Sequence, residues 1–96
     1  MPKAYIIAAE AIKDPASMAE YARAAAPVIT EGPGRVLALD PAPEVLEGDW
    51  QGRQTVLMEF ESVEAARAWH KSDAYQKVIP MRQAAADTDA VIVSGR

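Results

Sequence analysis

The apolar runs that predict the strands of this chain show no alternation of apolar and polar residues. Residues 36–39 and 91–93 are apolar throughout, and so is a longer run that begins at Ala4. Successive side chains of a strand point to opposite faces of its sheet. In the longer run both sets are apolar: Tyr5, Ile7 and Ala9 on one face, and Ala4, Ile6 and Ala8 on the other. An antiparallel sheet with one face in water normally alternates, so these strands require cover on both faces.

The chain is too short to supply that cover by itself. It has 96 residues, enough for one domain (1–96), and shows no repeat, linker or low-complexity tract. Its two helical segments can cover one face of a sheet. We therefore expect a homodimer in which the open faces of two sheets pack together into a barrel-like core. The alternative is a monomer with an unusually apolar solvent face.

Local signals predict where the helices begin and end. Asp14, followed by a proline, has the form of a helix cap, and the apolar residues after it recur at steps of three and four. Ser62 is the expected cap of a second helical region, which restarts at Ser72. We expect Pro27 to kink or end the first helix and Pro80 to interrupt the second helical region.

The predicted elements follow the order strand, helix, strand, strand, helix, strand. We place the four strands at residues 3–10, 35–39, 54–60 and 90–93. Between the middle two, residues 44–46 would extend the sheet edge before a turn at 47–49. This order is that of a ferredoxin-like β-α-β-β-α-β sandwich, an α+β fold with its helices on one face of an antiparallel sheet.

Composition excludes several classes of protein. Ten Lys and Arg against fourteen Asp and Glu leave a net charge of −4, which argues against nucleic acid or an anionic membrane as a partner. The absence of Cys and the single histidine, His70, exclude thiolate nucleophiles and multi-histidine metal sites. We find no targeting segment, membrane span, phosphate loop or dinucleotide fingerprint. We therefore expect a cytoplasmic protein with no metal and no cofactor.

Four stretches, in their order and spacing, resemble a known family. They are residues 3–5, 43–50 (PEVLEGDW), 59–60 with 62–66, and 68–75 followed by Pro-Met-Arg at 80–82. From Lys3 to Ser94 the chain is similar to domain of unknown function 1330, a bacterial branch of the dimeric α/β-barrel superfamily. The resemblance implies the ferredoxin-like fold and the dimer. It leaves the activity open, because the superfamily includes monooxygenases, lactone isomerases, haem-degrading enzymes and binding proteins.

Two charged residues are candidates for the chemistry of a site. Glu59 lies on the strongest predicted strand, where a half-buried carboxylate is a candidate general acid or base. Arg82 lies in an apolar segment, where its guanidinium can bind a substrate carboxylate in bidentate fashion. The alternatives are structural. Glu59 would then reach water or pair with a basic residue across the dimer, and Arg82 would form a salt bridge to Asp87, Asp89 or Glu59.

Three aromatic residues and the histidine complete the candidate site. Trp69, Tyr75 and Tyr21 are candidates to line a pocket between helices and sheet, although aromatic residues at helical spacing also form cores. His70 has an unperturbed pKa that suits proton transfer near neutral pH. It stands where the resembled family most often has Tyr, and its alternative role is that of an exposed or helix-capping histidine.

The hairpin at residues 44–49 is acidic, but its spacing matches no calcium-binding loop. We expect a solvated turn there, with the neighbouring Trp50 packed on the dimer partner.

The sequence thus supports two functions. The first is a cofactor-independent enzyme, isomerase- or monooxygenase-like, that acts on a small organic acid or lactone. In that hypothesis Glu59 and His70 are catalytic, and the substrate-binding residues are Tyr21, Trp69, Tyr75 and Arg82. The second is a non-catalytic homodimer that binds a small molecule or serves a structural role.

Overall fold

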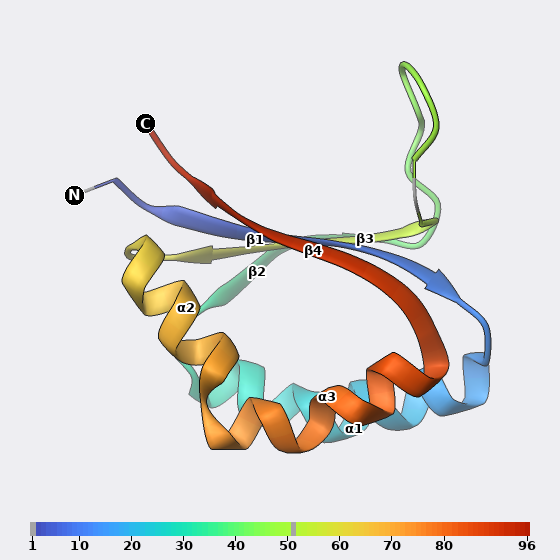
Figure 1. Cartoon of the computed structure of the whole chain (residues 1–96), viewed down its shortest axis with the longest axis horizontal. Coiled ribbons are helices and arrows are strands. Elements are labelled where there is room, and N and C mark those ends of the chain that lie inside the picture. Colours follow the sequence, from blue (N-terminus) through green and yellow to red (C-terminus); the bar gives the residue numbers. More distant parts are fainter. Residues whose placement is uncertain (1, 51) are drawn as a thin grey trace.

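The sheet and its helices form two layers in a computed structural model that describes residues 2–50 and 52–96 (Figure 1). The neighbouring strands all pair antiparallel, in the order β2-β3-β1-β4, and the helices cover one face (Figure 1). This arrangement confirms the predicted ferredoxin-like α+β fold. The elements are β1 (Ala4–Ile12), α1 (Pro15–Glu31), β2 (Arg35–Asp40), β3 (Gln54–Phe60), α2 (Val63–Lys71), α3 (Asp73–Ala85) and β4 (Ala86–Ser94).

Side-chain caps begin the helices at the predicted residues. Asp14, Ser62 and Ser72 each accept a hydrogen bond from a backbone N–H of the first helical turn, at 3.1, 3.1 and 3.3 Å. The Ser72 hydroxyl also donates to the carbonyl of Trp69 at 2.7 Å. Ser72 therefore ends α2 and begins α3, and the second helical region consists of two helices.

Neither of the two prolines inside helices ends its helix. Helix α1 continues through Pro27 to Glu31, and α3 continues through Pro80 to Ala85. Each proline lacks the N–H that would bond the carbonyl four residues earlier. Both prolines are exposed, so water can satisfy the freed carbonyls while the buried sides of the helices remain packed. The predicted interruption at Pro80 and the predicted end at Pro27 were wrong, because tertiary packing offsets this local cost, while the alternative of a kink at Pro27 stays a prediction.

The segment between β2 and β3 also differs from the prediction. Residues 44–46 form no strand and belong to a loop that projects from the sheet on the side opposite the helices (Figure 1). The Asp40 carboxylate accepts a hydrogen bond from the Ala42 N–H at 2.9 Å, which turns the chain out of the sheet. Pro41 and Pro43 have no N–H to offer a neighbouring strand.

The strand register assigns the side chains to two faces. Residues directly opposite each other share a face. Ile6 and its partner Met58 are buried and face the helices, whereas Ile7 and its partners Leu57 and Val91 face the other way. Strand β4 follows β1 over its whole length and begins at Ala86, earlier than the predicted residue 90. We call the side that carries Ile7 the open face.

An aromatic column closes the core at one end. The rings of Phe60 and Trp69 lie 5.5 Å apart, and Trp69 stacks on Tyr75 at 4.2 Å. A β-carbon at Gly34 would lie 2.5 Å from the Phe60 ring, so the chain entering β2 passes too close for any other residue. Within the described ranges, no helix combines the length and apolar character needed to cross a membrane.

Candidate functional site

A cavity of about 570 Å³ lies between the helix-covered face of the sheet and α1 and α3. Its walls are mainly apolar, with Ile6 from β1 and Met58 from β3 among them. Val36 and Leu39 also line it and are 44% and 56% exposed, so the cavity opens to solvent beside the β2 edge. This volume is within the range of roughly 300–1,000 Å³ that small-molecule sites occupy.

Arg82, Tyr75 and Tyr21 form a hydrogen-bonded chain in the wall of this cavity. Arg82 Nη1 donates to the Tyr75 hydroxyl at 2.9 Å, and the hydroxyls of Tyr75 and Tyr21 lie 2.8 Å apart. Burial and the neighbouring Tyr75 raise the pKa of Tyr21, which keeps its hydroxyl protonated. These three hydrogen-bonded side chains therefore present hydroxyl and guanidinium donors to one part of an apolar cavity.

The guanidinium of Arg82 has spare donors. The residue is 8% exposed, and its Nε is buried without a hydrogen-bond partner. Among the described residues it forms no ion pair. The salt bridges that the sequence allowed, to Asp87, Asp89 or Glu59, are absent, and Asp87 pairs with Lys13 at 3.2 Å instead. A buried cation with unused N–H groups favours binding of an anion or a carbonyl oxygen.

Glu10 is a cavity residue that sequence reasoning missed. It is 4% exposed and accepts a hydrogen bond from Gln54 Nε2 at 2.8 Å. Burial raises the pKa of its carboxyl above the usual range, against the smaller opposing effects of the Gln54 hydrogen bond and the Arg82 charge. The sequence did contain a signal for this position. Ile6, Ala8 and Glu10 lie two residues apart along one strand, so their side chains share a face of the sheet.

Trp69 and His70 extend the wall on the α2 side. Both line the cavity, together with Tyr75, whose ring lies 4.2 Å from Trp69 and 5.7 Å from His70. Partial burial, and then the charges of Arg82 and Lys71, lower the pKa of His70, so its imidazole is neutral at pH 7. The structure thus brings together five of the six predicted site residues.

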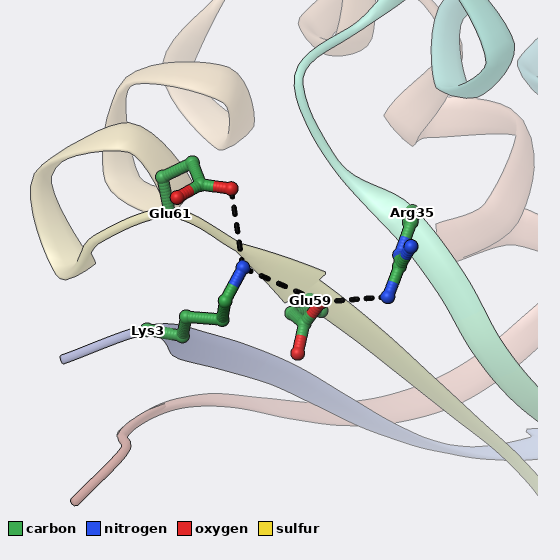
Figure 2. A network of polar contacts seen from close by, with 4 residues as sticks. All are labelled: Lys3, Arg35, Glu59 and Glu61. Atoms are coloured by element: carbon green, nitrogen blue, oxygen red, sulfur yellow. Dashed lines mark hydrogen bonds and ion pairs between the residues drawn. The ribbon is translucent and has the colours of Figure 1, made fainter.

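The sixth, Glu59, lies on the open face and outside the cavity. Its carboxylate pairs with Arg35 at 3.1 Å and with Lys3 at 3.9 Å, and Lys3 also contacts Glu61 at 3.2 Å (Figure 2). The sheet itself separates this ion-pair network from the cavity, since opposite strand positions carry the two sets of side chains. Glu59 cannot act on a ligand held among the other five residues.

A second hollow, of about 360 Å³, lies between the end of β1 and the base of the projecting loop. Glu10 and Gln54 line both this hollow and the main cavity. Trp50 belongs to its wall, and its Nε1 donates to the Thr55 hydroxyl at 2.8 Å. Across the described residues, three or more His, Cys, Asp or Glu side chains nowhere gather as metal ligands would.

Comparison with known proteins places this site in a family. The model of the family "Domain of unknown function (DUF1330)" matches residues 3–96. The chain belongs to the DUF1330 family. No curated protein matches this DUF1330 chain in sequence.

Solved structures resemble this DUF1330 protein in fold. A protein of unknown function from Rhodopseudomonas palustris superposes with a TM-score of 0.74 at 18% identity, over 99% of this chain and 83% of that one. SnoaB, a cofactor-independent oxygenase from Streptomyces nogalater, gives 0.71 at 11% identity, over 100% and 95%. A dimeric ferredoxin-like protein of unknown function from Thermobifida fusca gives 0.69 at 14% identity, over 97% and 91%. At these identities the likeness shows the fold alone.

Proposed function

We propose that this DUF1330 protein is a cofactor-independent enzyme that acts on a small, mainly apolar organic acid or lactone held in the main cavity. The observation that carries the proposal is the buried Arg82 guanidinium, which spends one hydrogen bond on Tyr75 and keeps unused donors in an apolar enclosure. A buried charge without such partners is costly. An anionic or carbonyl group of a ligand supplies them.

The remaining cavity residues have roles that follow from their positions. The Tyr75 hydroxyl accepts a hydrogen bond from the guanidinium and the Tyr21 hydroxyl bonds Tyr75, while Trp69 and His70 shape the wall beside them. SnoaB, with the same fold, is described as a cofactor-independent oxygenase. That description supports isomerase- or monooxygenase-like chemistry without a cofactor on this scaffold.

Ligand binding by Arg82 variants tests this function. The probe is phenylpyruvate, an aromatic 2-oxo acid with an apolar ring and a carboxylate, measured by calorimetry and by thermal shift. Arg82→Ala should raise its dissociation constant at least about tenfold, because charge-assisted hydrogen bonds contribute roughly 1.5–3 kcal/mol. Arg82→Lys should recover part of the affinity, since it restores the charge without the planar fork.

The matched control is Arg67→Ala, which removes an exposed arginine from α2 outside the cavity lining. It should bind phenylpyruvate as the wild type does. Equal affinities for wild type and Arg82→Ala, with both folded, would overturn the anchoring role of Arg82. An absence of binding to the wild type would favour the purely structural homodimer.

We also propose that the protein forms a homodimer through the open face. Val91 and Val93 on this face are 55% and 41% exposed, and Ile7 and Leu57 lie beside them in the sheet. Contiguous apolar surface of this kind marks an interface. The Thermobifida fusca protein of the same fold is described as dimeric, which supports the same assembly here.

A further inference from the structure

Glu10 is the one carboxylate that the described residues place in the main cavity, and it is only half satisfied. Its Oε1 accepts the hydrogen bond from Gln54, which is the one hydrogen bond that the described residues make to this side chain. The side chain comes from β1 at the centre of the sheet, so its backbone is held on both sides by β3 and β4. A rigidly placed carboxylate with a free oxygen in an apolar cavity is suited to proton transfer.

We propose that Glu10 is the proton-transfer group of this cavity, and that the substrate class is a small apolar acid with a carbonyl group whose neighbouring carbon carries an acidic hydrogen. This inference rests on the proposed function, because it needs a ligand anchored at Arg82. Arg82 and Glu10 both line the main cavity. Base and cationic donor thus serve the same enclosed space, as enolate formation requires.

The reaction step balances without an oxidant, a reductant or a metal ion. Glu10 Oε2 takes a proton from the carbon beside the carbonyl, so a C–H bond breaks and an O–H bond forms. The electron pair of the C–H bond becomes the carbon–carbon double bond of an enolate, and the carbonyl π pair moves to its oxygen. Arg82 N–H groups stabilise this oxygen. Return of the proton from Glu10 to the oxygen or to another carbon completes an isomerisation.

Gln54 is the positioning residue for this group. Its amide donates to one carboxylate oxygen at 2.8 Å, which restricts rotation of the carboxylate and leaves the other oxygen for proton transfer. Glu10 and Gln54 also border the second hollow near the projecting loop. That hollow gives the carboxyl a route for proton exchange with solvent that does not pass through the ligand.

Hydrogen exchange into phenylpyruvate tests the proposal directly. The C3 protons of this probe exchange with heavy water through its enol, and proton NMR follows their loss. Wild type should accelerate the exchange, and Glu10→Gln should slow it by about 10²- to 10⁴-fold, the usual contribution of a general base. Glu10→Gln keeps the size of the side chain and an oxygen for Gln54 to bond, so phenylpyruvate binding should stay within about threefold.

The matched control is Glu59→Gln, the same substitution on the open face of the same sheet, which should exchange as fast as the wild type. Binding with equal exchange rates in wild type and Glu10→Gln would overturn the role of Glu10 and leave the proposed function standing. If the wild type does not bind phenylpyruvate, both the role of Glu10 and the proposed function are overturned. These two failures are therefore distinguishable.

A pH profile keeps the test decisive if Glu10→Gln folds poorly. The wild-type exchange rate should fall on the acid side as Glu10 becomes protonated. Gln54→Leu removes a hydrogen bond that lowers the pKa of Glu10, so this acid limb should move to higher pH. Arg82 on α3, Tyr21 on α1 and His70 on α2 face the same cavity and are unchanged in this variant. An acid limb that does not move would contradict the assignment to Glu10.

Discussion

The two faces of the sheet surround the same kind of side chain in different ways. On the helix-covered face, Glu10 is 4% exposed and its hydrogen bond comes from the neutral amide of Gln54. On the open face, the Glu59 side chain is 14% exposed and pairs with two cations, Arg35 and Lys3 (Figure 2). Two cations contact the Glu59 carboxylate, whereas burial raises the pKa of the Glu10 carboxyl. The neighbours therefore decide what a glutamate can do here.

The apolar side chains of the two faces also differ in their surroundings. Those on the helix-covered face enclose a cavity of about 570 Å³ within one chain. Those on the open face, such as Val91 at 55% exposure, meet solvent in the isolated chain. In our proposal one face holds a small molecule and the other packs on a second copy of the protein, and this contrast can be tested in three ways.

The largest effect should come from a charge on the open face. Val91→Lys places an ammonium group where the second sheet would pack, and burying an unpaired charge costs several kcal/mol. The dimer dissociation constant should rise at least about a hundredfold, measured by sedimentation equilibrium. The exposed helix variant Ala74→Lys is the control and should leave the dimer intact. A wild type that sediments as a 10.3 kDa species would refute the dimer.

A smaller effect should appear in the pH dependence of stability. The folded protein raises the pKa of Glu10 above its usual 4.5 by burial, so in the window above 4.5 the folded state binds more protons than the unfolded state. Stability contributed by this group is therefore lost as pH rises through that window. The free energy of unfolding by urea, measured against pH, should decline less for Glu10→Gln than for wild type. Parallel curves for the two proteins would contradict a raised pKa.

The smallest effect should come from the ion pairs of the open face. Glu59→Gln removes the contacts to Arg35, whose side chain is 71% exposed, and to Lys3. Pairs with such exposed partners contribute about 0.2–1 kcal/mol, and salt weakens them. The melting temperature should fall slightly at low salt and less at high salt. A large, salt-independent loss would show that the dimer buries this network.

Features set by neighbours in the chain were predictable from sequence. Asp14, Ser62 and Ser72 cap helices where expected, because a cap needs only its own side chain and the next turn. The two internal prolines were not, since their outcome depends on packing and solvent on opposite sides of a helix. The family resemblance and the order of elements were confirmed over residues 3–96.

The candidate site also has features that the sequence predicts and features that depend on tertiary packing. Tyr21, Trp69, His70, Tyr75 and Arg82 line one cavity, and their roles in binding or catalysis stay predictions. The hydrogen bond from Arg82 to Tyr75 was not foreseen, although the two residues lie seven positions apart on one helix and so share a face. The contact of Tyr75 with Tyr21 could not be foreseen, because it depends on how α1 packs against α3. Glu10 ends the first predicted strand and is not among the predicted site residues, although its alternation with Ile6 and Ala8 indicates a shared face.

By itself, the sequence determined the order of elements, the helix caps and the apolar character of both sheet faces. It determined these because caps and strand alternation depend on residues a few positions apart. Only the tertiary structure decided which face the helices cover, and with it that Glu10 enters the cavity while Glu59 joins an ion-pair network. Alternation along a strand sets which residues share a face. Which of the two faces is covered depends on the packing of helices that are distant in the sequence.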